Sequence, residues 1–451
     1  MRMPESTVDA TNGVIWQRLL ALFFPLWFGT LFQQLYNTVD TMVVGRFVGK
    51  QALAAVGCTA TIISLTVGIF AGVASGAVVI IARYFGAKRD DFVRTEVHTA
   101  MLLSLIIGAV FTLLGYAAAP WLLRLMDTTP DTIADATLYL QVYFLGMIPN
   151  VVYNMGTGVL RAVGDTKKPL YFLIAASVCN IVLDLLLVVG LDMRVLGAAL
   201  ATVISQLLSA VLVVACLLRA KGEPYQLAPR ELRINRASLQ HILAMGVPAA
   251  LQSMTYSCSN ILIQAVINSF GTDTVAAWSA YSKIDVLFWL FMNSMGLAVT
   301  TYVSQNYGAG KFDRLKEGVR LSIKLSMGFT AILSVFMLLL ARPLLSIFIT
   351  EQVVLDIGLD IMRFLVPCYI TYVLVEILAG AVRGAGKALV PTLITVFGVC
   401  GLRLLWVFAA VPTHCTMMMV ILSYPITWVV TSLALTIYYF KGRWLAYNAD
   451  F

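Results

Sequence analysis

Charged side chains are scarce in this sequence. Only 12% of its 451 residues are Asp, Glu, Lys or Arg, whereas 60% are apolar. Soluble domains carry about 25% charged residues, so this chain lacks the polar surface that a water-soluble protein of its length needs. Apolar runs of about 20 residues recur along the sequence, which is the length at which an α-helix crosses a bilayer. The short alternating segments of a β-barrel are missing. We therefore predict an all-α polytopic membrane protein.

The sequence also lacks the motifs of metal, disulfide and nucleotide chemistry. Its seven cysteines form no CxxC pair, and His98, His241 and His414 are far apart in sequence. No HExxH motif, nucleophile elbow or glycine-rich dinucleotide loop occurs. The segment "RGAGKAL" resembles the end of a Walker A motif but has Ala388 where Ser or Thr is required. We expect no enzyme activity, no cofactor and no use of ATP.

Counting the apolar runs and the helix-breaking segments between them predicts twelve transmembrane helices. They are expected near residues 15–46, 52–82, 95–119, 131–159, 169–190, 195–219, 239–270, 274–305, 317–341, 352–380, 389–410 and 416–440.

The distribution of the basic residues predicts the orientation of these helices. With the N-terminus inside, twenty-three of the 31 Lys and Arg residues fall in segments on the inner side and six on the outer side. An excess of Lys and Arg marks the cytoplasmic side. The formal charge of +8 therefore indicates contact with membrane lipid and not a nucleic-acid partner. Both termini are expected in the cytoplasm.

An internal repeat divides the sequence into two halves. Pro25 and Pro248 each lie near the start of a long helix, and "FVGKQALAAVG" matches "FGTDTVAAWS" with one residue deleted. At an offset of 222 residues, "ARYFGAKRDD" matches "SQNYGAGKFDR" and "LRAVGDTKKP" matches "VRGAGKALVP". Six helices per half give both halves the same orientation, so the repeats are parallel, with a cavity expected between them.

This repeat sets the expected domain boundaries. They are a cytoplasmic tail at 1–14, an N-lobe at 15–219, a cytoplasmic linker at 220–238, a C-lobe at 239–440 and a second cytoplasmic tail at 441–451.

Acidic residues inside apolar segments are candidates for function, because a charge at bilayer depth is costly. Asp40 shares a helix face with Gln33, Tyr36 and Asn37, and Asp184 lies one turn after Asn180 in "VCNIVLDLLLVV". If these faces meet, the two carboxylates cannot both stay ionised cheaply, so the pair would hold a proton or a hard cation on oxygen ligands. The alternative is that each carboxylate pairs with a local polar group.

Two further acids lie in the second half. Asp285 has Lys283 nearby, and neutralisation by that lysine would explain it; a functional role for this carboxylate is the alternative. Glu376, about two turns before Arg383, either contacts a cationic substrate or is solvated near the cytoplasmic end. Pro25 and Pro248 are expected to kink their helices and are candidate hinges.

These motifs together resemble the MATE (multidrug and toxic compound extrusion) family. The similarity lies in "QQLYNTVDTMVVG", "ALAAVG", "FGAKR", "YGAGK", "LRAVGDTKKP" and "VRGAGK", and it covers residues 15 to 440. The resemblance implies a secondary active antiporter in the plasma membrane of a bacterium. Such a protein exports organic, cationic and amphipathic drugs in exchange for H⁺ or Na⁺ by alternating access. We expect a monomer.

The resemblance also implies roles for particular residues. The proton or Na⁺ site of one branch of the family corresponds here to Asp40, Asn180, Asp184 and Thr202. The substrate cavity corresponds to Gln33, Tyr36, Tyr139 and Asn154, to which the residue pattern adds Asn37 and Glu376. Pro25 corresponds to the proline of a bent first helix. Another branch carries a Glu near the position of Tyr256, so a C-lobe ion site of that kind is not implied.

Two other classes remain as alternatives. A lipid-linked precursor flippase of the related superfamily would share the architecture and need a cationic cavity for phosphates. A membrane-embedded enzyme would need a nucleophile, metal cluster or cofactor motif, and the sequence has none.

Overall fold

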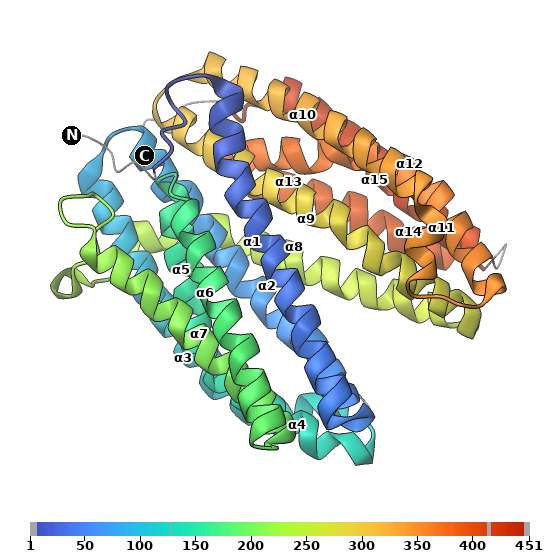
Figure 1. Ribbon diagram of the computed structural model, residues 1–451. Coiled ribbons are helices and arrows are strands. Elements are labelled where there is room, and N and C mark those ends of the chain that lie inside the picture. Colours follow the sequence, from blue (N-terminus) through green and yellow to red (C-terminus); the bar gives the residue numbers. More distant parts are fainter. Residues whose placement is uncertain (1–6, 127, 413–415, 446–451) are drawn as a thin grey trace. The chain divides into compact units, whose positions relative to one another are not determined.

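The protein is described here by a computed structural model that covers residues 7–126, 128–412 and 416–445. His414 therefore lies outside the described residues, as do parts of both predicted tails. Within the described residues the chain forms helices and no strands (Figure 1). Ten helices are long and apolar enough to cross a membrane. The other two predicted spans fall on α4–α5 and on α8, which completes twelve spans.

The first six spans comprise helices up to Arg219. They are α1 (Ile15–Val43) with the π-helix η1 (Val44–Val48), α2 (Lys50–Gly86), α3 (Asp90–Leu125), α4 (Pro130–Leu145), α5 (Met147–Ala162), α6 (Lys167–Asp184) with the π-helix η2 (Leu185–Gly190), and α7 (Arg194–Arg219). The predicted single helix at 131–159 is divided at Gly146. A Cβ there would lie 2.9 Å from Val203 Cγ2 and 2.8 Å from Gln206 Oε1 of α7, so the chain passes close to that helix at this point.

The last six spans follow a short connecting segment that contains η3 (Pro229–Glu231). They are α8 (Arg236–Asn268), α9 (Thr272–Gly308), α10 (Phe312–Leu339) with α11 (Ala341–Ser346), α12 (Gln352–Gly384), α13 (Leu389–Thr395) with the π-helix η4 (Val396–Gly401) and α14 (Leu402–Ala409), and α15 (Met417–Lys441).

The predicted repeat is also present in the backbone, where positive φ angles recur at equivalent positions of the two halves. Positive φ values occur at Gly49 and Gly271, at Lys88 and Gly310, and at Gly164 and Gly386, and the two members of each pair are 222 residues apart. Gly49 and Gly271 immediately precede α2 and α9, which are both 37 residues long. Because left-handed backbone is costly for other residues, glycine at these turns fixes where each long helix begins. The two halves thus share one backbone plan.

The described chain forms two compact units whose borders fall inside helices. Unit 1 holds the described residues up to Ala10 together with Phe24–Ala250, and unit 2 holds Thr11–Phe23 together with the described residues from Leu251 on. The borders inside α1 and α8 lie within three residues of Pro25 and Pro248, and both helices continue through their proline. The N-terminal part of α8 and the connecting segment therefore belong to unit 1.

The connecting segment is held on the N-terminal end of α3. Arg94 donates two hydrogen bonds of 2.6 Å to the carboxylate of Glu231. The backbone N–H of Ala228 donates to His98 Nε2 at 2.9 Å, and the N–H of Asn235 donates to Thr99 Oγ1 at 3.2 Å. The predicted linker is thus an ordered part of unit 1.

Within unit 1, α2 packs against the first part of α8 at glycines. A Cβ on Gly76 would lie 2.4 Å from the carbonyl oxygen of Ile242, and a Cβ on Gly72 would lie 2.4 Å from the backbone nitrogen of Ala250. The two helix backbones can therefore approach this closely only because both positions lack a side chain.

Candidate transport site

Asp40 on α1 and Asp184 at the end of α6 meet inside unit 1. Their carboxyl groups are close neighbours. Asp184 is fully buried, and Asn180, one turn earlier, is 1% exposed. Two neighbouring carboxylates in a buried site repel each other when both are ionised, so a proton or a cation bound there stabilises the pair.

The polar atoms around this pair have few partners. No N–H or O–H group of the described residues reaches either carboxyl oxygen of Asp184, and Asn180 makes no side-chain hydrogen bond. Buried polar atoms of folded proteins are almost always hydrogen-bonded. Unpartnered oxygens from two carboxyls and one amide are suited to a proton, a water molecule or a hard cation.

Thr202 on α7 and Tyr139 on α4 complete the surroundings. Thr202 is 8% exposed and donates to the carbonyl of Ala198 at 3.0 Å. The phenol of Tyr139 is buried near the Thr202 hydroxyl and near Asp40. The sequence-predicted ion-site residues are therefore neighbours in the structure.

An apolar cluster lies next to the carboxyl pair along both helices. Val43 and Val44 follow Asp40 by one turn, and Val188 follows Asp184 by one turn. These three side chains pack with Val195 in one buried cluster, where the π-helices η1 and η2 lie against each other. π-helical turns are frequent at functional sites, because they break the regular backbone ladder. Here they directly follow the two helical segments that carry the acids.

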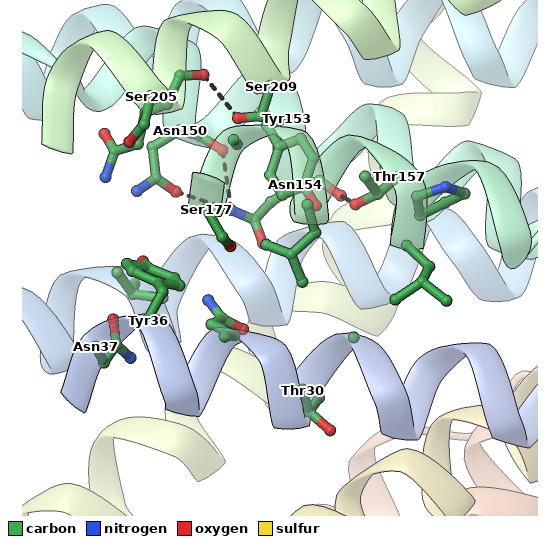
Figure 2. A pocket seen from close by; sticks show the side chains of 18 of the residues that line it. Thr30, Tyr36, Asn37, Asn150, Tyr153, Asn154, Thr157, Ser177, Ser205 and Ser209 are labelled. Atoms are coloured by element: carbon green, nitrogen blue, oxygen red, sulfur yellow. Dashed lines mark hydrogen bonds between the residues drawn. The ribbon is translucent and has the colours of Figure 1, made fainter. Parts of the chain in front are cut away.

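Unit 1 also contains a polar cavity of about 380 Å³. Figure 2 shows Thr30, Tyr36 and Asn37 of α1 across the cavity from residues of α5, α6 and α7. Of the sequence-predicted residues, the lining includes Pro25, Gln33, Tyr36, Asn37, Asn154 and Asn180. Tyr139 is buried beside Thr202 and is not part of the lining.

On the α5 wall of the cavity, only Asn154 is predicted from the sequence. On α5, Asn154 Nδ2 donates to Asn150 Oδ1 at 2.8 Å, and Thr157 donates to the carbonyl of Asn154 at 3.1 Å. Tyr153 and Arg161 of the same helix also line the cavity. Their spacing of three, four and seven residues in "NVVYNMGTGVLR" is the signal that would have found this polar stripe.

A second wall, on α7, was also missed. Ser205, Gln206 and Ser209 line the cavity there, within two turns of Thr202. Ser205 donates to the carbonyl of Thr202, and Ser209 to that of Gln206, both at 2.8 Å.

The acids of unit 2 have protein partners. Asp285 on α9 accepts hydrogen bonds from Tyr369, from Trp289 Nε1 at 2.7 Å and from Tyr281 at 3.2 Å. The expected neutralisation by Lys283 is wrong, because the lysine side chain is exposed and makes no ion pair with Asp285. Three aromatic donors satisfy this carboxylate instead.

Glu376 on α12 likewise has a partner within unit 2. Its Oε1 accepts from Arg383 at 3.2 Å, and its Oε2 accepts from Tyr372 at 3.4 Å. Glu376 and Pro248 are not part of the lining of the unit 1 cavity.

The comparisons with known proteins agree with this architecture. A family model described as MatE matches residues 25–186 and 248–408, one match in each repeat. The chain belongs to the MATE family of transporters. It is therefore a multi-pass membrane transporter and not an enzyme.

Relatives of this MATE protein are named for drug resistance and for another cargo. The "Probable multidrug resistance protein YoeA" of Bacillus subtilis is 29% identical over 446 residues, which covers 97% of this chain and 96% of the relative. A protein of Shewanella oneidensis named "FAD transporter" is 26% identical over 78% of each chain. A solved MOP superfamily transporter from Pyrococcus furiosus, whose description reports reverse polarity of its binding pocket, superposes with a TM-score of 0.92 at 22% identity. It covers 99% of this chain and 100% of its own.

Proposed function

We propose that this MATE protein is a secondary active multidrug exporter of the bacterial plasma membrane. It expels organic, mainly cationic and amphipathic compounds in exchange for H⁺ or Na⁺. Asp40, Asn180, Asp184 and Thr202 bind the coupling ion, and the adjoining cavity of unit 1 binds the substrate.

The contrast between the acids of the two units supports this assignment. Asp285 accepts from three aromatic donors and Glu376 is paired with Arg383, whereas Asp40 and Asp184 have mainly each other. A carboxylate that already has hydrogen-bond or ion-pair partners in the protein is stabilised little further by binding an ion. A pair of acids that the fold leaves without a counter-charge is stabilised by any proton or cation that enters.

The coupling then follows from competition for one negative site. With the site open to the outside, H⁺ or Na⁺ binds between Asp40 and Asp184 and lowers the affinity for a cationic substrate, which leaves. With the site open to the cytoplasm the ion dissociates, and the anionic pair attracts the next substrate. Each ligand shifts the conformational equilibrium only by its differential affinity for the two states. Pro25, beside the unit border in α1, is the proposed hinge.

The test is efflux of ethidium from proteoliposomes under a pH gradient or a Na⁺ gradient imposed separately. Wild-type protein should export the dye with one of these gradients, and Asp40→Asn should reduce that gradient-driven rate at least fivefold. The matched control is Asp131→Asn, an exposed acid at the start of α4. Normal gradient-driven efflux by a folded Asp40→Asn variant would overturn the mechanism.

A flippase for lipid-linked precursors remains the second candidate, because Arg161 places a cation in the cavity lining. Absence of ethidium flux under both gradients, together with translocation of a lipid-linked pyrophosphate, would favour it.

A further inference from the structure

Arg161 is an unpaired cation in the lining of the unit 1 cavity. It lies in the last turn of α5, and its Nε is buried without a hydrogen-bond partner. Among the described residues no carboxylate forms an ion pair with it. The nearest acid in sequence, Asp165, is fully buried and is paired with Lys168 at 2.7 Å. The fold therefore brings a guanidinium to the cavity and supplies no counter-charge.

The surroundings of Arg161 are neutral and polar. Thr157, Thr166 and Asn154 line the same cavity, as does Tyr153, two turns before Arg161 on α5. A buried cation without an anionic partner is costly, particularly at membrane depth. Such a cost is recovered when a ligand brings the missing anion.

Arg161 lines one end of the cavity, and the carboxyl pair lies just beyond the other end, one helical turn past the lining residues Tyr36 and Asn180. Arg161 precedes the start of α6 by six residues, and Asp184 is the last residue of α6. Pro169 and Asn180, both in the lining, are eleven residues apart on α6, which corresponds to about 16 Å along the helix axis. The cavity thus has a cationic end at Arg161, and its far end, lined by Tyr36 and Asn180, leads towards the carboxyl pair.

We propose that Arg161 anchors a carboxylate of the transported molecule, so that the cavity selects dipolar organic compounds. The positive end of the substrate faces Asp40 and Asp184, and its carboxylate is held by the guanidinium. Planar, two-pronged pairing makes guanidinium a better carboxylate ligand than ammonium. This inference rests on the proposed function only in taking the unit 1 cavity as the substrate site.

Two dyes that differ by one methyl ester test the proposal. Rhodamine 110 carries a free carboxylate and is dipolar, whereas its methyl ester, rhodamine 123, is a simple cation. Binding of each dye to purified protein in lipid nanodiscs would be measured by fluorescence anisotropy without any ion gradient. Wild type should bind rhodamine 110 more tightly than rhodamine 123.

Substitution of Arg161 should change the preference and not merely the affinity. Arg161→Gln should weaken rhodamine 110 at least tenfold relative to rhodamine 123, and Arg161→Lys should give an intermediate ratio. Arg124→Gln, a change at an exposed arginine at the end of α3, should leave the ratio as in wild type.

Equal weakening of both dyes by Arg161→Gln would overturn the proposal, because it would assign Arg161 a structural role. A wild-type preference for rhodamine 123 would overturn it even if the variants fail to fold. Binding of the dyes is measured without an ion gradient, so this test does not depend on coupling. If Asp40→Asn still showed gradient-driven efflux, the proposed ion site would be wrong, but the dye-binding result would stand.

Discussion

The carboxyl group of Asp40 lies next to that of Asp184, and no N–H or O–H group of the described residues donates to Asp184. The two residues come from α1 and α6 and form one site, so neither can bind an ion independently of the other. A site shared in this way makes a specific prediction about combined substitutions.

Asp40→Asn and Asp184→Asn should each abolish ion-driven efflux, and the double variant should be no worse than either single one. Residues that act as a unit are not additive in their effects. The measurement is the initial rate of ethidium efflux from proteoliposomes at matched protein density. Two independent sites would give a different result: each single variant would retain part of the rate, and the losses would multiply in the double variant.

Asp285 should matter for stability and not for coupling. Asp285→Asn replaces the carboxylate that accepts from Tyr281, Trp289 and Tyr369, and hydrogen bonds to charged groups contribute about 1.5–3 kcal/mol each. We expect a lower melting temperature in detergent and a wild-type ratio of gradient-driven to passive dye flux in liposomes. If Asp285→Asn instead lowered the ratio of gradient-driven to passive flux without changing the melting temperature, the coupling site would lie in unit 2.

Gly76→Ala should destabilise the protein, whereas Gly57→Ala on the same helix should not. The new methyl group at position 76 would lie 2.4 Å from the carbonyl oxygen of Ile242, while nothing lies within 4 Å at position 57. Overpacking costs about 1–3 kcal/mol, and alanine in a helix is favoured over glycine by about 1 kcal/mol. Thermal unfolding in detergent should rank Gly57→Ala at or above wild type and Gly76→Ala below. The reverse order would contradict the packing of α2 on α8.

The attachment of the connecting segment should weaken in acid. The hydrogen bonds from Arg94 hold the pKa of Glu231 below its usual value of 4.5. A lowered pKa in the folded state means that the stabilisation is complete above pH 4.5 and is lost as the pH falls through the lowered pKa. Hydrogen–deuterium exchange of residues 220–235, corrected for intrinsic rates, should show protection at pH 6 that declines towards pH 3.

Variants separate this effect from general acid unfolding. Glu231→Gln should reduce protection of the segment at pH 6 and remove most of its pH dependence, whereas Glu351→Gln at an exposed position should behave as wild type. If Glu231→Gln keeps full protection at pH 6, the ion pair does not hold the segment.

The helices and the repeat were readable from the sequence because they follow local rules. Apolar runs long enough to span a bilayer, and glycines needed at left-handed turns such as Gly49 and Gly271, leave direct marks in the residue order. The grouping of Asp40, Tyr36 and Asn37 on one face followed from helix periodicity in the same way. That Asp40 faces Asp184 was a hypothesis, since periodicity gives the face of each helix and not its neighbour.

Other features depend on contacts that no local rule reports. Lys283 was the natural partner for Asp285 by proximity in sequence, yet Tyr369, from another helix, supplies a donor. At Gly146, where the predicted single helix is divided, the chain passes close to Val203 on another helix. The polar stripe on α5 has a periodic signal, but hydroxyl and amide groups such as those of Thr157 and Asn150 are common in membrane helices and are weaker indicators of a site than buried acids.

The division of α1 between the units has a consequence for the order of synthesis. Thr11–Phe23 belongs to unit 2, where Lys311 binds the carbonyl of Thr11 at 2.8 Å and Phe23 packs on Phe291. Translation proceeds at about 5–20 residues per second, so this stretch leaves the ribosome tens of seconds before its partners exist. Unit 1 can complete its fold once Ala250 has been inserted, but unit 2 must recruit the oldest part of the chain last. The start of α1 is thus a closing element, and its docking marks the completed molecule.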